Sequence, residues 1–286
     1  MKIAILTDTN SGIYEEEAEK MGIFVMPMPV IIEDETFYEG SNLTEEEFLE
    51  ALTSGKKVST SQPAPGDLLD TWDDLLKKYD QVVYIPMSSG LSHSCSAAMA
   101  IAREYEGRVF VVDNHRISVT LRQSVITAKA MAMEEKNADE IKSFLEAEAF
   151  RSSIYVSVNT LEYLKKGGRI TPAAAMIGSV LNIKPVLTIQ GEKLDSFAKV
   201  RGNMKKCEKR MMEAVKADIQ DRFSDVPEEY LHIGTAGAGL SPEGKREWME
   251  MITKAFPKAD VYYNPLSASI ATHTGPGAVG LGVSVF

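Results

Sequence analysis

Short apolar runs alternate with longer segments of helical periodicity along the first half of the chain. The apolar runs are rich in β-branched residues, have the length of buried strands, and lie at 2–6, 82–85 and 108–112. The segments with helical periodicity lie at 66–79, 94–105 and 117–135. Strands that alternate with helices in this way are typical of parallel βαβ units, so the first half is expected to form a doubly wound sheet.

After about residue 150 the pattern changes, because apolar runs follow one another with fewer long helical segments between them. These runs lie at 153–158, 185–189, 194–200, 230–235, 258–263 and 279–285. We therefore expect an α/β protein of two domains. An N-terminal parallel-sheet α/β domain would cover residues 1–150 and a C-terminal mixed α/β domain residues 151–286, with an approximate boundary that can be discontinuous along the chain.

Two helix starts carry capping signals. Thr44 precedes three glutamates, which is a capping-box arrangement on a negatively charged first turn. Thr171 precedes Pro172, so a side-chain cap is followed by proline at the first helical position. We expect helices to begin directly after Thr44 and Thr171.

Charge and cysteine content exclude several classes of partner and site. The 286 residues are 44% hydrophobic, enough for a substantial core, and carry a formal net charge of −10. Binding to a nucleic-acid backbone relies on clustered Lys and Arg, so nucleic acid is not expected as a partner. Cys95 and Cys207 share no short spacing, which predicts two buried, reduced thiols rather than a zinc or redox pair.

The chain shows no targeting segment, and its longest apolar runs are far shorter than the roughly 20 residues that span a bilayer. We therefore expect a cytoplasmic protein. No metal-ligand cluster and no phosphate-binding loop of the P-loop type is visible, so neither a metal nor a cofactor is expected.

Two polar loops offer hydroxyl groups for a ligand. Residues 88–92 follow a buried strand and precede a helix that begins near Ser94, so an anion held there would face free N–H groups and a positive helix end. The alternative is that these serines only cap the helix. Residues 60–66 form a second polar turn stiffened by two prolines, although a plain turn has the same composition.

His273 stands beside a glycine- and proline-rich stretch close to the end of the sequence. The stretch 275–280 matches Gly-x-Gly-x-x-Gly, but the dinucleotide motif also needs a following helix and an acidic residue about 20 positions on. A terminal strand follows instead, so we reject NAD binding and expect these glycines to form a tight turn or a close approach to a ligand. A buried core histidine remains the alternative for His273.

These three segments, together with 161–170 and 181–187, resemble the DegV family of bacterial fatty-acid-binding proteins, and the resemblance runs from Thr7 to the C-terminus. It implies a long-chain fatty acid held between two α/β domains, with its carboxylate bound by hydroxyls and a histidine. The matching positions are Thr60 and Ser92 in the first domain and His273 in the second.

The resemblance also implies a role for this protein. Members called FakB are carriers, not enzymes, and present the fatty acid to a separate ATP-dependent fatty acid kinase that converts the carboxylate to an acyl phosphate. Arg169 and Arg201 match the arginines implicated in that step. No catalytic residue, nucleotide site or metal is implied in the carrier itself, and peripheral contact with a membrane during ligand exchange is compatible with the role.

The apolar residues after Thr171 are candidates for the wall of the acyl-chain channel, with ordinary core packing as the alternative. They are Ala173 to Ala175, Met176, Ile177, Val180 and Leu181. The sequence departs from the family in the serine loop, which commonly continues with Gly-Thr where this chain has His93, Ser94 and Cys95. The departure leaves chain length and unsaturation of the ligand open.

A serine hydrolase is the alternative from a different class. Residues 90–94 approach the nucleophile elbow Gly-x-Ser-x-Gly on a strand-to-helix turn, so that Ser92 would be the nucleophile and His273 the base. Against this, Ser94 stands where the elbow has its second glycine, and Asp113 is only a stand-in for the acid. Labelling of Ser92 by a fluorophosphonate is the test that separates the two classes.

Overall fold

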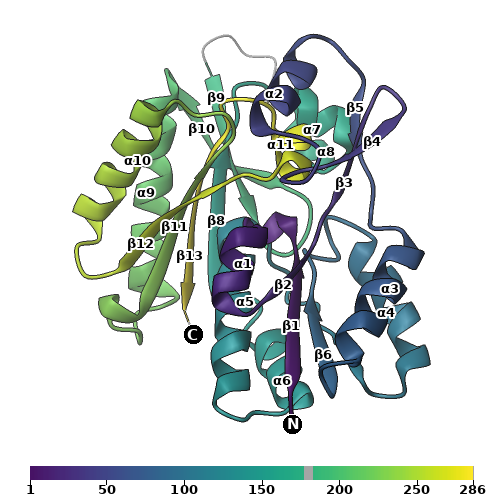
Figure 1. Cartoon of the computed structure of the whole chain (residues 1–286). Coiled ribbons are helices and arrows are strands. Elements are labelled where there is room, and N and C mark those ends of the chain that lie inside the picture. Colours follow the sequence, from purple (N-terminus) through teal and green to yellow (C-terminus); the bar gives the residue numbers. More distant parts are fainter. Residues whose placement is uncertain (177–182, 286) are drawn as a thin grey trace.

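The computed structural model describes residues 1–176 and 183–285, and these form a mixed α/β protein with a parallel sheet in the N-terminal half and a mixed sheet in the C-terminal half (Figure 1). The parallel sheet has the order β2-β1-β6-β7. Its strands are β1 (Ile3–Asp8), β2 (Phe24–Met26), β6 (Gln81–Ile85) and β7 (Val109–Val111). The sequence predicted β1, β6 and β7 because they read as continuous apolar runs, whereas the three-residue strand β2 was not predicted.

Helices cover both faces of the parallel sheet, as required by a strand β1 whose successive residues are buried in two different cores. Ala4 and Leu6 face α3 and α4, whereas Ile5 faces the core shared with α5 and α6. The helices of this half are α1 (Glu15–Met21), α2 (Glu45–Thr53), α3 (Pro65–Leu76), α4 (Ser94–Ala102), α5 (Ser118–Met133) and α6 (Ala138–Ala147), with 3-10 turns at Thr9–Ser11 and Arg103–Tyr105.

The second large sheet has six strands in the order β10-β9-β8-β13-β11-β12, antiparallel except for the pair β11 and β12. They are β8 (Ser152–Ser157), β9 (Ile183–Ile189), β10 (Asp195–Arg201), β11 (Leu231–Gly237), β12 (Asp260–Pro265) and β13 (Val279–Val285). The amphipathic helices α9 (Met204–Asp221) and α10 (Pro242–Ala255) cover one face. The other face meets α5 and the core of the first half.

A small antiparallel sheet of order β4-β3-β5 lies above the parallel sheet in Figure 1, close to α2 and α11. Its strands are β3 (Pro29–Ile32), β4 (Glu35–Tyr38) and β5 (Val58–Thr60). The remaining helices are α7 (Glu162–Gly167), α8 (Pro172–Ala175) and α11 (Ala268–Thr274), with a 3-10 turn at Glu228–Tyr230. The sequence patterns did not predict this sheet, because its strands are short and only partly apolar.

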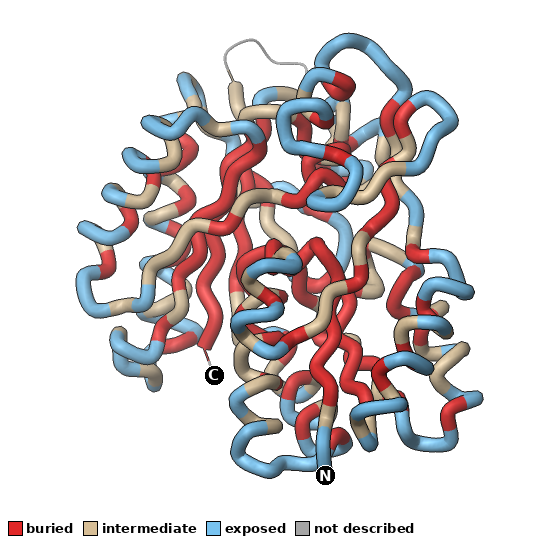
Figure 2. The backbone as a smooth tube through the Cα atoms, viewed as in Figure 1, coloured by how far each residue is buried: buried red, intermediate tan, exposed pale blue. Residues whose placement is uncertain are grey.

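Helix α5 joins the two large sheets. It contacts β1 and β6 of the first sheet and β11 and β13 of the second, and the Tyr262 hydroxyl donates a hydrogen bond to the Val119 carbonyl at 2.7 Å. One apolar core accordingly contains residues of both halves, and Figure 2 shows buried positions along the strands of both sheets. Whether residues 1–150 and 151–286 behave as separate domains stays a prediction.

The strands and helix starts expected from the sequence are confirmed, with ends that shift by a few residues. Thr44 accepts a hydrogen bond from Glu47 N in a complete capping box, and Thr171 caps α8 through Ala174 N with Pro172 in the first turn. The second half contains two long helices, α9 and α10, which the sequence pattern underestimated. Among the described residues, no helix combines the length and apolarity needed to cross a membrane.

Candidate functional site

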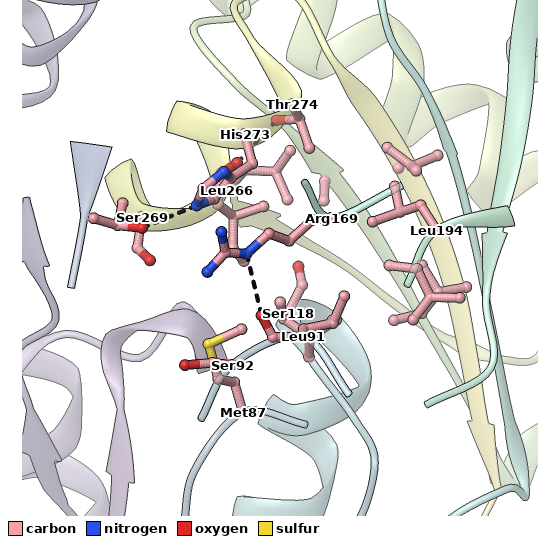
Figure 3. Close-up of a pocket in the computed structure, with 18 of the residues that line it drawn as sticks. Met87, Leu91, Ser92, Ser118, Arg169, Leu194, Leu266, Ser269, His273 and Thr274 are labelled. Atoms are coloured by element: carbon pink, nitrogen blue, oxygen red, sulfur yellow. Dashed lines mark hydrogen bonds between the residues drawn. The ribbon is translucent and has the colours of Figure 1, made fainter. Parts of the chain in front are cut away.

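A pocket of about 910 Å³, counted with the open space at its mouth, lies between the six-stranded sheet, the loop after β6, the start of α5, the end of β5 and α11 (Figure 3). Small-molecule sites are typically concave and mostly apolar, with a few polar groups that fix the orientation of the ligand. Most of its wall is aliphatic. The polar side chains on the wall are those of Thr60, Ser61, Gln62, Ser92, Ser118, Arg169, Ser269, His273 and Thr274. The structure thus brings together four of the five site residues predicted from the sequence.

Thr60 and His273 form a hydrogen-bonded pair in this pocket. Thr60 ends β5 and His273 lies in the last turn of α11, and Thr60 Oγ1 is 2.9 Å from His273 Nε2. The other ring nitrogen, Nδ1, is buried without a hydrogen-bond partner and packs against Gly167, where an added Cβ would lie 2.1 Å from it. Glycine at position 167 therefore lets the ring sit where Nε2 reaches Thr60.

Burial keeps the imidazole uncharged. Desolvation lowers the pKa of His273 from 6.5 to about 4, and the nearby Arg169 guanidinium lowers it further in the same direction. At neutral pH the ring is therefore a neutral hydrogen-bonding group rather than a cation. A hydroxyl and a neutral imidazole side by side can return hydrogen bonds to a buried carboxylate without forming a fixed ion pair.

The loop after β6 supplies Ser92, as its position at the carboxyl end of a parallel strand predicted. Ser92 Oγ accepts a hydrogen bond from Ser94 N at 3.2 Å, so it satisfies one free N–H at the start of α4 while it also faces the pocket. His93 occupies the N-cap position and makes no side-chain cap. Ser88 is committed elsewhere, because its hydroxyl donates to the Gly191 carbonyl at 2.5 Å and ties this loop to the turn between β9 and β10.

Arg169 lies in the pocket wall rather than only at a partner-facing surface. Its Nε donates to the Leu91 carbonyl at 3.3 Å and its Nη1 bonds the Gly167 carbonyl, so the guanidinium is anchored to both sides of the pocket. In Figure 3 it points into the space between His273 and Ser92. A fixed positive charge at this place favours an anionic group between the hydroxyls and the imidazole.

The buried carboxyl group of Asp8 holds a turn of the pocket wall in place through hydrogen bonds. Asp8, at the end of β1, accepts hydrogen bonds from Asn10 N and Met87 N, each at 2.9 Å. Burial raises the pKa of Asp8 to about 6, against the lowering effect of these hydrogen bonds. The contacts hold the turn that contains Met87, which is itself part of the pocket wall.

Two further expectations have a different outcome. Arg201 ends β10, is exposed, and is not part of the pocket wall. Ala173 to Met176 are also absent from the pocket wall, and Met176 is 82% exposed, so their assignment to the acyl-chain channel is wrong. They lie on the short helix α8 and the residue after it, where only Ala174 is buried. Ile177, Val180 and Leu181 lie outside the described residues.

The geometry required of a serine hydrolase is not formed among the described residues. No hydrogen bond joins Ser92 to His273, whose Nε2 is paired with Thr60 instead. No carboxylate supports the imidazole, because Nδ1 has no partner, and the Asp113 carboxylate accepts hydrogen bonds from Ser89 N and His115 N. A triad needs an acid to orient and charge-stabilise its histidine. Within residues 1–176 and 183–285, no group of three or more His, Cys, Asp or Glu is placed to hold a metal ion.

Ser118 is a pocket residue that the sequence reasoning missed. It opens α5 with a φ of 54°, and its hydroxyl is buried without a hydrogen-bond partner. A serine at the start of an expected helix suggests an ordinary cap, so its type and place in the sequence gave no reason to assign it to a ligand site. Its unusual backbone conformation appears only in the fold.

The glycines after His273 form the tight turn expected of them. Gly275 and Gly277 have φ values of 78° and 72°, and an added Cβ would lie 2.4 Å from Tyr163 and 2.3 Å from Asn159 respectively. Both the left-handed backbone and the close packing therefore require glycine. The turn leads into β13, which confirms that this stretch is not a dinucleotide-binding motif.

Known proteins of one family are similar to this chain along almost its whole length. A DegV domain-containing protein of Deinococcus radiodurans is 29% identical over 287 residues, which is 98% of each chain. A DegV domain-containing protein of Caldanaerobacter subterraneus is 30% identical over 286 residues, again 98% of each chain.

Solved structures agree with these relatives. A DegV family protein from Thermus thermophilus, described by its fatty acid binding, is 28% identical with a TM-score of 0.89 over 100% of both chains. DegV of Bacillus subtilis, described as a fatty acid binding protein, is 28% identical with a TM-score of 0.86 over 100% of both chains. A family model described as an uncharacterised protein of the DegV family matches residues 2–285. This chain therefore belongs to the DegV family.

Proposed function

We propose that this protein binds a long-chain fatty acid in the pocket between its six-stranded sheet and the polar loops of the first half, with the carboxylate at Thr60, Ser92 and His273. The observation that carries the proposal is the Thr60–His273 pair at 2.9 Å in a pocket whose wall is otherwise mainly aliphatic. The fatty acid binding described for the Thermus thermophilus and Bacillus subtilis proteins supports the same ligand class.

The physical chemistry of a fatty acid matches the two parts of the pocket. A palmitate-like chain has about 14 methylenes, and burial at roughly 0.8 kcal/mol each contributes about 11 kcal/mol before ordering costs. The aliphatic wall supplies affinity, and the head-group contacts fix the register of the chain. The carboxylate regains the hydrogen bonds it loses on leaving water from the hydroxyls and the neutral imidazole, in the positive field of Arg169.

The proposal includes a carrier role without catalysis by this chain. The bound fatty acid is presented to a separate ATP-dependent fatty acid kinase, which phosphorylates the carboxylate to an acyl phosphate. Arg169 would hold the head group for transfer, and the exposed Arg201 would contact the kinase. Arginine suits both tasks because its fixed charge and forked donors match carboxylate and phosphate oxygens.

Native mass spectrometry of the purified protein, followed by solvent extraction, tests the ligand. A stoichiometric fatty acid, or its uptake by delipidated protein, is the expected result. His273→Ala and Thr60→Val should weaken binding, whereas Thr53→Val on the exposed end of α2 serves as the matched control. A protein that takes up no fatty acid at any chain length contradicts the proposal, as does labelling of Ser92 by a fluorophosphonate.

The carrier role has its own test. Arg201→Ala should leave fatty acid affinity unchanged and reduce acyl-phosphate formation by a fatty acid kinase, with Arg246→Ala on the exposed face of α10 as the control. Arg169→Ala should reduce both binding and transfer, because the side chain lies in the pocket wall. If both Arg201→Ala and Arg169→Ala supported acyl-phosphate formation at the wild-type rate, neither arginine would have the proposed role in the transfer.

A further inference from the structure

Two rows of small residues cross β11 and β13 on the face that looks toward α5. In one row Gly234 pairs with Gly282, and in the next row on the same face Ala236 pairs with Gly280. On the other side of β13 these rows continue to Ile154 and Val156 of β8. Neighbouring positions of the same strand, Val279 and Val283, belong to the opposite core under α9 and α10.

The first row is small because α5 packs into it. An added Cβ on Gly234 would lie 2.3 Å from the Cβ of Val119, and one on Gly282 would lie 2.5 Å from Cγ2 of the same valine. Real Cβ atoms do not approach other atoms this closely, so both glycines are required by the packing of Val119. The fold itself accounts for this row.

No side chain packs closely against Gly280 in the second row, which pairs it with Ala236. An added Cβ on Gly280 would meet Ala236 Cβ at 3.5 Å and the Tyr155 carbonyl at 3.6 Å, which are ordinary contacts, and no other described atom outside its chain neighbours comes within those distances. Gly280 also does not have a positive φ, so its backbone conformation is open to residues with a side chain. Glycine inside a strand costs roughly 0.5 to 1 kcal/mol relative to alanine. Neither packing nor conformation explains its presence.

What Gly280 and Ala236 share is the pocket. Both belong to its wall, as do Val156 beside them and Val119 of α5, which packs on the adjacent row. Their neighbours on the sheet carry aliphatic side chains, so this is the part of the wall that suits an acyl chain rather than a carboxylate. Because Gly280 and Ala236 have little or no side chain, the space that larger side chains would occupy belongs to the pocket.

We propose that Gly280 and Ala236 keep open the part of the pocket that receives the acyl chain, and so set the upper limit of chain length. The inference rests on the proposed fatty acid binding and adds the residues that determine which acids bind. A larger aliphatic residue in this row occupies space that the ligand would otherwise take. Each ligand methylene that loses its place in the pocket lowers affinity about fourfold.

Chain-length profiles of delipidated protein test this inference. Dissociation constants are measured for saturated acids of 10, 12, 14, 16 and 18 carbons with wild type, Gly280→Val and Ala236→Val. We expect both variants to bind the shortest acids as wild type does and to lose at least fourfold affinity for the longest. Gly66→Val is the matched control, since Gly66 is exposed on α3, has an ordinary φ and has nothing within 4 Å of an added Cβ.

The outcomes separate this inference from the proposed function. If wild type binds fatty acids but both variants keep its chain-length profile, or lose affinity equally at every length, the row does not limit the acyl chain. If wild type binds no fatty acid, the proposed function itself is wrong and the inference goes with it. Melting temperatures report whether the variants fold, and Gly280→Ala, whose added atom makes only ordinary contacts, repeats the test on a smaller scale if valine prevents folding.

Discussion

Replacing His273 with glutamine should remove a pH-dependent part of the protein's stability. In the folded protein burial, aided by Arg169, lowers the pKa of His273 from 6.5 to about 4. The unfolded chain therefore takes up a proton near pH 6.5 that the folded protein accepts only near pH 4. The histidine's contribution to stability is fully present above pH 6.5 and is lost as the pH falls toward 4.

The size of the effect follows from these two pKa values. Between pH 8 and pH 5.5 the free energy of unfolding should fall by about 1.4 kcal/mol through His273 alone. The lower limit keeps the protein above its isoelectric point, near pH 5.1. Asp8 titrates in the same range with the opposite sign, because burial raises its pKa to about 6 and its contribution falls as the pH rises. The comparison of wild type with His273→Gln cancels that second contribution.

Urea unfolding at pH 8, 7, 6 and 5.5 measures the difference directly. We expect wild type to lose about 1.4 kcal/mol relative to His273→Gln across this range. Parallel stability curves for the two proteins would refute the idea of a buried neutral imidazole. Addition of a fatty acid should reduce the difference, because a carboxylate beside the ring favours its protonated form and raises its pKa.

Three further predictions follow from single contacts. Thr60→Val removes the partner of His273 Nε2 and should lower the free energy of unfolding by about 1 to 3 kcal/mol, measured by urea unfolding. Gly282→Val places side-chain atoms against Val119 and should lower the melting temperature far more than Gly280→Val on the same strand; equal effects would contradict the packing argument. Ser118→Gly should raise the melting temperature of the ligand-free protein, because the φ of 54° costs a serine about 1 kcal/mol and the buried hydroxyl has no partner to lose. A lower melting temperature would show that this hydroxyl has a partner in solution.

Much of the fold could be predicted because its signals are local. The strands of the parallel sheet are continuous apolar runs, and Thr44 and Thr171 mark helix starts through side-chain hydrogen bonds to residues three positions on. The antiparallel strands β3 to β5 were missed because each has only three or four residues and little apolar periodicity. The same weakness left Ala173 to Met176 open between channel wall and ordinary core, since apolar composition does not say which surface a helix buries.

The candidate site also has a part that could be predicted from the sequence and a part that could not. Polar and glycine-rich turns marked three candidate segments, and the resemblance to the DegV family assigned Thr60, Ser92 and His273 within them. They could not predict that Arg169 points into the same pocket, that Gly167 makes room for the imidazole, or that Ser118 leaves its hydroxyl unpaired. Those facts depend on contacts between segments that lie far apart in the chain.

The sequence by itself determined the α/β class, the order of the main strands, the capped helix starts and the exclusion of a dinucleotide motif, because periodicity and turn chemistry act over a few residues. Only the tertiary structure decided which polar groups share a cavity and what charge His273 carries. It also decided beside which glycines other side chains pack and beside which glycines space remains. Thr60 and His273 are 213 positions apart. Their meeting, and the burial that keeps the imidazole neutral, arise when α11 packs against β5 and α7, and no local pattern encodes that packing.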